Sequence, residues 1–211
     1  NNLGSVLIDM RRFAEACVVL RGALNLQPQY VKARRNLVLA LRESGRLDEA
    51  FAHGKKVLEQ DPTDVQMMII LANGALMLHR LDEYVTHCEK WAASEPHNHW
   101  ALESVGIAYL DQGQIEAAVK AFDQALAIAP NSPAAHYCRG MAYFFLGDFR
   151  RGWIDYEWRW QIKEFVTQNF PQPLWNGEDL RGKTILVRAE QGLGDSLQFI
   201  RYLKPLRDRG C

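Results

Sequence analysis

A glycine-rich turn near the C-terminal end of the sequence has the residue types and spacing of a ligand-binding loop. Residues 183–189 form a short apolar run rich in β-branched side chains, which predicts a buried strand. Gly192 and Gly194 follow it, and residues 196–209 have the apolar periodicity of a helix. Strand, glycine loop and helix open a βαβ unit, in which backbone N–H groups and a helix N-terminus suit an anion.

The usual nucleotide-binding signatures do not match this loop. Leu197 stands where the third glycine of a dinucleotide fingerprint would fall, which argues against NAD. The Lys-Ser/Thr pair of a phosphate-binding loop is absent as well. Asp195 directly precedes the predicted helix at Ser196, where aspartate is a good N-cap, so a purely structural role is open to it.

Histidines and cysteines form no recognisable metal or nucleophile motif. His97 and His99 flank Asn98 in a predicted turn, with His87 and Glu95 nearby, but His-x-His pairs in exposed loops are mostly solvated, and we expect no metal. The cysteines show no Cys-x-x-Cys spacing, which predicts reduced, mostly buried thiols in a cytoplasmic protein. They are Cys17, Cys88, Cys138 and Cys211.

Composition and charge exclude several classes of protein. The chain is 48% hydrophobic and 24% charged, so it can fold, and its 25 basic and 25 acidic residues argue against tight nucleic-acid binding. No apolar run approaches the roughly 20 residues that cross a membrane, and no signal-peptide layout is present. The sequence begins at Asn1 without a methionine and ends just after an apparent helix end, which predicts a fragment of a longer protein.

The charge is unevenly distributed along the chain. Residues 1–60 hold 10 basic and 6 acidic groups, residues 61–130 hold 3 and 10, and residues 131–211 carry a net charge of +3. Such a pattern is most simply the solvated outer faces of helices, although it would also orient a charged partner along the chain.

The larger part of the chain is built on a 34-residue period. Pro28, Pro62, Pro96 and Pro130 are each 34 residues apart. A proline cannot continue a helix, so each one predicts a helix end. At the same period, Gly45 and Gly113 share a column with Gly147, Arg11 and His79, and glycine there allows a tight reversal between paired helices. Because His79 and Tyr84 replace the usual glycine and alanine, we expect a looser turn in the third repeat.

These features resemble the tetratricopeptide-repeat (TPR) family. Residues 99–132 carry its signature spacing in Val105-Gly106, Tyr109, Ala118, Phe122 and Pro130. The resemblance implies an all-α, right-handed superhelix of about five helix-turn-helix repeats, in which each repeat contacts its neighbours. The repeats are expected at about 1–30, 31–64, 65–98, 99–132 and 133–163.

The resemblance also implies a function and a binding surface. In TPR proteins the first helix of each pair lines a concave groove that binds an extended peptide or a partner helix. The expected groove residues here are Asn2, Lys32, Arg35, Asn36 and Leu39. In some TPR proteins an asparagine ladder binds the peptide backbone. In this chain the ladder is broken after Asn2 and Asn36, and a solvated helix residue is the plainer interpretation of Asn36.

An aromatic segment ends the repeats. On a helix, Trp153, Tyr156 and Trp160 fall on one face and Trp158 on another. Aromatic residues at helical spacing are usually core, so we expect packing within or between domains rather than a ligand-stacking platform. Residues 164–182 are rich in Pro and Gly, which predicts a linker.

The C-terminal part resembles a second group. Trp175-x-Gly177-x-x-Leu180-x-Gly182, with the loop that follows and the earlier Tyr-Glu-Trp-Arg-Trp run, is similar to bacterial proteins in which TPRs precede a heptosyltransferase-related glycosyltransferase domain. The resemblance implies that residues 183–211 begin a truncated Rossmann-like domain, with Gly192 and Gly194 shaping its loop and Asp195 as the base. It also implies a nucleotide sugar as cofactor of the full-length parent.

Two functions follow as hypotheses. In the first, the chain is the protein-interaction module of a glycosyltransferase, and the fragment itself has no cofactor and no activity. In the second, it is a pure scaffold whose α/β segment is degenerate. Glu190 would contact an acceptor or stabilise the loop. Apolar surface on the incomplete C-terminal segment would favour self-association.

Overall fold

The computed structural model describes residues 1–163, 171–188 and 192–211, apart from the side chain of Asp195. The chain forms two compact units, Asn1–Arg159 and Trp160–Cys211. The first is entirely helical apart from its turns. Its helices are α1 (Asn2–Asp9), α2 (Phe13–Leu26), α3 (Val31–Glu43), α4 (Leu47–Gln60), α5 (Val65–Met77), α6 (Leu81–Ser94), α7 (His99–Asp111), α8 (Ile115–Ile128), α9 (Pro133–Phe145) and α10 (Phe149–Tyr156), followed by the 3-10 helix η1 (Glu157–Gln161).

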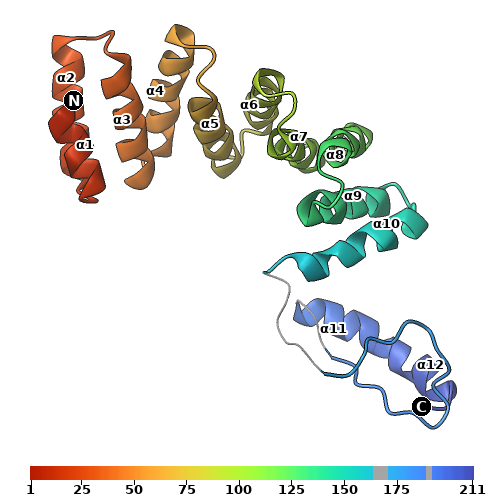
Figure 1. The fold of residues 1–211 in the computed structure, drawn as a ribbon. Coiled ribbons are helices and arrows are strands. Elements are labelled where there is room, and N and C mark those ends of the chain that lie inside the picture. The colour runs from red at the N-terminus through yellow and green to blue at the C-terminus, as the bar shows by residue number, and fades with distance from the viewer. Residues whose placement is uncertain (164–170, 189–191) are drawn as a thin grey trace. The chain divides into compact units, whose positions relative to one another are not determined.

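The helices follow the 34-residue period of the sequence. Helices α3, α5, α7 and α9 begin at residues 31, 65, 99 and 133, and their partners α4, α6, α8 and α10 begin 16 residues later. Asp64, Asn98 and Ser132 cap α5, α7 and α9 by accepting a backbone N–H bond with their side chains. Each second helix also packs on the first helix of the next repeat, and the first helices lie on the inner side of the resulting curve (Figure 1).

The turns between paired helices all use the same backbone conformation. Gly45, Gly113 and Gly147 have φ values of +73°, +78° and +75°, in the left-handed region. Arg11 and His79 stand in the same column with φ values of +58° and +55°. The expectation of a looser turn at His79 is therefore wrong, because the two helices of the repeat impose the left-handed turn even on a residue with a Cβ.

Helices of one repeat approach closely because a glycine on one faces a bulky side chain on the other. A Cβ added to Gly4 would lie 2.5 Å from Leu20, and one added to Gly106 would lie 2.5 Å from Phe122. In the last repeat the neighbour is backbone, since a Cβ on Gly140 would lie 2.8 Å from the amide nitrogen of Tyr156. Phe122 and Leu20 are fully buried, so these two contacts form the centres of the first and fourth repeats.

His87 is a titratable group inside this core. The side chain on α6 is 5% exposed and packs edge-on against the Phe51 ring at 5.8 Å, and the described residues offer its Nδ1 no hydrogen-bond partner. Burial lowers the pKa of His87 to about 4, and the positive charge of Lys90 adds to the effect. Burial also lowers the pKa of His53. The neutral imidazole is therefore the form that fits the fold.

We expect the array to lose stability in acid. The pKa of His87 is about 4 when folded, and about 6.5 is ordinary for an unfolded chain. Between these values the unfolded state binds more protons, so stability falls as the pH drops through the window. The contribution of His87 is about 2 kcal/mol between about pH 7.5 and about pH 5. Urea unfolding at both pH values measures it. His87→Leu should shrink the difference, and an unchanged pH dependence in this variant would contradict the assignment.

The aromatic segment departs in part from its predicted helix. Helix α10 ends at Tyr156, and η1 continues as a tighter turn. Trp158 stacks on the His136 ring with centroids 4.1 Å apart and planes 8° apart, which agrees with a packing role. Trp153 contacts Phe144 edge-on at 4.8 Å but is 52% exposed.

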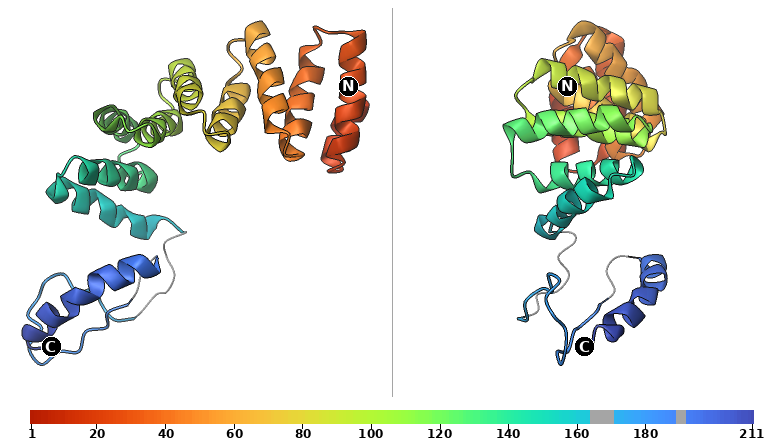
Figure 2. Two further views of the ribbon diagram at one scale, coloured as in Figure 1. Left: turned by 180° about the vertical axis from the view of Figure 1, so that it is seen from behind. Right: turned by 90° about the vertical axis from the view of Figure 1, so that its right-hand side faces the viewer.

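The second unit contains short helices and turns. In its described part, these are α11 (Leu193–Phe199), the 3-10 helix η2 (Ile200–Tyr202) and α12 (Leu203–Asp208), and the amide of Gly182 donates to the carbonyl of Gly210 at 3.1 Å (Figure 2). The predicted strand is not formed over residues 183–188. A strand needs a neighbouring strand to take its N–H and C=O groups, and the described residues contain none. No helix among these residues is long and apolar enough to span a membrane.

Candidate functional site

The predicted groove residues lie on the first helices α1 and α3, and their environments differ. Asn2 and Lys32 are exposed, whereas Asn36 and Leu39 are partly buried. The side-chain amide of Asn36 donates to Oδ1 of Asn1 at 2.8 Å, so part of its hydrogen-bonding capacity joins the first two repeats. Leu39 packs against the core. Lys32 and Asn2 are thus the groove candidates that reach solvent most freely.

Arg35 contributes to a junction between repeats. Its guanidinium lies 2.6 Å from Oδ2 of Asp61 and 2.6 Å from Oδ2 of Asp64, the cap of α5. The pKa of Asp61 is lowered mainly by the Thr63 hydroxyl, with Arg35 adding to it. Two carboxylates therefore hold the Arg35 charge, which leaves it less available to a partner than the exposed Lys32.

Glu103 takes the place of Arg35 two repeats later. It is buried on α7, and its Oε1 accepts a bond of 2.6 Å from the hydroxyl of Ser132, the cap of α9. The same helix position thus links one repeat to the next cap in both places. The second link leaves the carboxylate with a neutral partner instead of an opposite charge.

The first helices α5, α7 and α9 are more apolar than α3. Trp100, at the position equivalent to Lys32, is 65% exposed, and Met77 and Phe145 are exposed at the ends of α5 and α9. In the first repeats the corresponding positions carry Lys32, Glu43 and Asp9. Large exposed apolar side chains on the inner helices are features of a binding surface. The 34-residue alignment of the sequence could have identified Trp100, since the polar residues Lys32 and Gln66 precede it in its column.

A shallow hollow lies beside Trp100, where the loop after α6 meets α7. It has a volume of about 520 Å³ and is lined by Glu95, Pro96, His97, Asn98, His99 and Trp100. Oε2 of Glu95 accepts bonds of 2.8 Å from Trp91 Nε1 and from the Asn98 amide. These two bonds lower the pKa of Glu95, so the hollow holds an ionised carboxylate next to an exposed indole.

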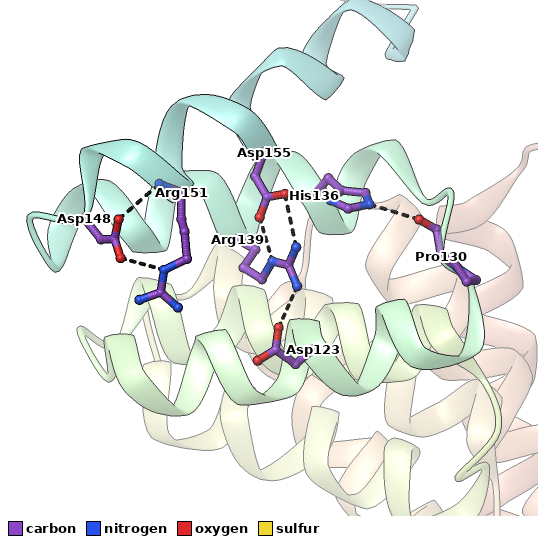
Figure 3. Close-up of polar contacts among 7 residues, drawn as sticks. All are labelled: Asp123, Pro130, His136, Arg139, Asp148, Arg151 and Asp155. Atoms are coloured by element: carbon purple, nitrogen blue, oxygen red, sulfur yellow. Dashed lines mark hydrogen bonds and ion pairs between the residues drawn. The ribbon is translucent and has the colours of Figure 1, made fainter.

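The last repeat contains a buried polar cluster that sequence reasoning missed (Figure 3). Asp155 on α10 is 5% exposed and lies 2.8 Å from Nδ1 of His136 and 2.6 Å from Nε of Arg139, both on α9. Arg139 also donates to Asp123 on α8 at 2.6 Å, and Nε2 of His136 lies 2.9 Å from the Pro130 carbonyl. The cluster therefore joins α8, α9, α10 and the preceding turn.

The carboxylates of this cluster favour the charged form of Arg139. Burial lowers the pKa of Arg139, but its bonds to Asp155 and Asp123 more than offset this, and the net shift is upward. Arg139 occupies the column of Leu37, Leu71 and Val105, which are core residues in other repeats. That departure from an apolar column is the signal that could have identified it. The cluster links the two helices of the last pair.

The thiols and histidines of the described residues form no reactive or metal centre. No group of three His, Cys, Asp or Glu side chains there is arranged to hold a metal ion. Cys17 and Cys88 are buried, and burial raises the pKa of Cys88 to about 12 and that of Cys138 to about 11. Thiols with such values stay protonated and are poor nucleophiles.

The predicted loop of the second unit differs from its expected form. Helix α11 begins at Leu193, with Gly192 as its N-cap, so Gly194 and Asp195 lie inside its first turn. Asp195 is therefore not the cap of a helix that begins at Ser196. Glu190 lies outside the described residues. The role of Asp195 as a base stays a prediction.

Comparison with known proteins supports the repeat interpretation. Residues 1–65 match the family described as "Tetratricopeptide repeat", and residues 106–147 match "TPR repeat". The protein FlbA of Caulobacter vibrioides is 29% identical over 186 residues, which cover 85% of this chain and 31% of FlbA. The chain thus spans about a third of that relative's length. Because the match is longer than the helical array, it includes part of the second unit.

Solved structures share the fold of the array. A crystal structure of MamA has a TM-score of 0.69 at 19% identity and covers 76% of this chain and 94% of its own. MamA from Desulfovibrio magneticus RS-1 has a TM-score of 0.68 at 17% identity, covering 77% and 92%. Residues 1–65 and 106–147 thus carry tetratricopeptide repeats, and helices α1–α10 form a superhelix of the TPR type.

Proposed function

We propose that the array binds an extended peptide or a short helix of a partner protein along its inner surface. The observation that carries the proposal is the set of exposed side chains on the first helices, which are polar at Asn2 and Lys32 and apolar at Met77, Trp100 and Phe145. A partner on this surface would meet hydrogen-bonding groups in the first repeats and apolar side chains in the later ones.

Matched double variants test this surface. The inner variant combines Lys32→Glu with Asn36→Ala, both on α3. The outer variant combines Lys56→Glu on α4 with Gln124→Ala on α8, which reverses one charge and removes one side-chain amide at exposed positions. Partners co-purified with each form are compared by quantitative mass spectrometry, and the affinity of the most enriched partner is then measured by calorimetry. We expect the inner variant to weaken binding by about tenfold or more and the outer variant to leave it unchanged.

Two outcomes would contradict the proposal. Equal loss in both variants, with unchanged unfolding midpoints, would mean that charge rather than the inner surface governs binding. Full retention in the inner variant would mean that the partner binds elsewhere. The scaffold hypothesis needs no more than inner-surface binding, so it is the simpler proposal for the whole protein.

The glycosyltransferase hypothesis for a longer parent rests on the sequence resemblance of residues 152–202 alone. None of the matches described above concerns a glycosyltransferase. Sugar transfer, a nucleotide-sugar cofactor, the catalytic role of Asp195, self-association through the second unit and a cytoplasmic location all stay predictions.

A further inference from the structure

The hollow beside α7 combines two groups that recognise the same kind of ligand. The Trp100 indole is 65% exposed and contacts the His99 ring edge-on, with centroids 4.3 Å apart. An exposed indole offers a face with negative electrostatic potential, to which a cation is attracted. Within the described residues, no arginine or lysine of this chain takes that place, although such contacts are made on Phe51, Tyr143 and Tyr156.

Glu95 supplies a charge that favours a cation in the same hollow. Both of its hydrogen bonds, from Trp91 and Asn98, go to Oε2, and the described part of the chain gives Oε1 no donor. Glu95 lines the hollow, and because its pKa is lowered, its carboxylate is ionised and can accept a hydrogen bond from a ligand there. An anionic ligand would be repelled here, and an apolar one would give Oε1 no hydrogen-bond donor.

The surroundings of the hollow are consistent with a positive ligand. Residues 61–130 hold 3 basic and 10 acidic groups. Glu95 also follows the last turn of α6, where backbone carbonyls carry partial negative charge. The N–H groups at the start of α7 carry a partial positive charge, which would oppose a cation. This charge is reduced because the Asn98 side chain accepts a hydrogen bond of 3.0 Å from the backbone N–H of Trp100.

We infer that this hollow binds the guanidinium group of an arginine from a partner protein. A guanidinium is planar, so it stacks on the Trp100 ring and directs N–H donors to Oε1 of Glu95 at the same time. A lysine ammonium would make one of these contacts well but not both. The inference rests on the proposed partner-binding function, because Trp100 lies at the helix position of Lys32 on the inner surface.

The test uses the whole 211-residue chain and a small probe, so that it does not depend on the natural partner. The probe is the blocked pentapeptide acetyl-Gly-Gly-Arg-Gly-Gly-amide, titrated into ¹⁵N-labelled protein while the tryptophan indole N–H signals are recorded. Its matched control has citrulline in place of arginine, which keeps the shape and removes the charge. Signals are assigned with Trp100→Phe and Trp91→Phe.

We expect saturable shifts of the Trp100 and Trp91 indole signals with the arginine peptide and much weaker ones with citrulline. Glu95→Gln keeps an acceptor for Trp91 and Asn98 but removes the charge, and it should weaken binding by about tenfold. Glu116→Gln, which neutralises an exposed carboxylate on α8, should leave binding unchanged. Trp100→Ala should abolish saturation.

Equal shifts with arginine and citrulline, no saturable shift, or unchanged binding in Glu95→Gln would overturn the inference. A lysine peptide that binds as well as arginine would overturn the choice of guanidinium. This result is separate from the inner-surface test with Lys32→Glu and Asn36→Ala. If the arginine peptide binds in the hollow but the Lys32→Glu and Asn36→Ala variant keeps full partner binding, the proposed groove is rejected and the hollow is kept. If that variant loses partner binding but the arginine peptide does not bind, the hollow alone is rejected.

Discussion

Gly140→Ala is expected to lower the free energy of unfolding of the last repeat by about 3 kcal/mol, because the added methyl group meets backbone rather than a movable side chain. A Cβ at Gly140 would lie 2.8 Å from the Tyr156 amide nitrogen, 3.0 Å from the Gly152 carbonyl oxygen and 3.2 Å from the Asp155 carbonyl carbon. Helices α9 and α10 would have to separate, and a buried cluster that links them would separate with them.

Gly22→Ala is the matched control for this substitution. Gly22 also lies inside a helix, α2, but an added Cβ would meet no atom within 4 Å. Alanine is a better helix former than glycine by about 1 kcal/mol, so this variant should be more stable than the parent. Urea unfolding followed by circular dichroism compares the two, and hydrogen exchange locates the loss in Gly140→Ala to α9 and α10. Similar stabilities for both variants would rule out the close backbone contact.

Asp155→Ala is expected to destabilise the array by about 3 kcal/mol, because it leaves buried donors without their carboxylate. His136 would lose its 2.8 Å contact, and Arg139 would lose bonds of 2.6 and 3.1 Å. Of the carboxylates that bind Arg139 in the described residues, Asp123 would remain, and it is half exposed.

Asp123→Ala removes an exposed carboxylate from the same cluster and should therefore cost less stability than Asp155→Ala. The Asp123 side chain is 53% exposed, and pairs of this kind contribute at most about 1 kcal/mol. The double variant Arg139→Met with Asp155→Leu should recover much of the stability lost in Asp155→Ala, since a buried ion pair replaced by apolar side chains of similar size is often tolerated. Thermal and urea unfolding measure all three. A cost for Asp155→Ala no larger than that for Asp123→Ala would contradict the role assigned to the cluster.

The repeated part of the fold follows from the sequence because each repeat is specified locally. The prolines at a 34-residue spacing marked the helix ends, and the column of Gly45 and Gly113 marked the turns. The conformation at His79 could not be predicted from residue type, since its positive φ is imposed by the packing of α5 on α6. At this position the packing of the helices outweighs the intrinsic conformational preference of histidine.

The candidate site was predictable only in part. Lys32 and Asn2 are exposed on the first helices, and their role in a groove stays a prediction. The partners of Arg35 come from the next repeat and are not visible in the sequence of one helix. The Glu95 carboxylate depends on Trp91 and Asn98, which are brought together by the end of α6 and the turn after it. The strand expected at 183–189 is not formed over its described residues. A strand needs a neighbouring strand to pair with, and the local sequence does not show whether one is present.

The pairing of a glycine with a bulky side chain inside one repeat restricts how such an array can be recombined. Gly106 and Phe122 lie on the two helices of a single repeat, as do Gly4 and Leu20. An unequal crossover in the loops near the prolines carries both partners together and leaves each core filled. A crossover in the turn between the two helices would join Val38 of α3 to the Phe122 helix, where only a glycine leaves room for the ring. Shuffled or engineered descendants of this array should therefore have their breakpoints between repeats, not within them.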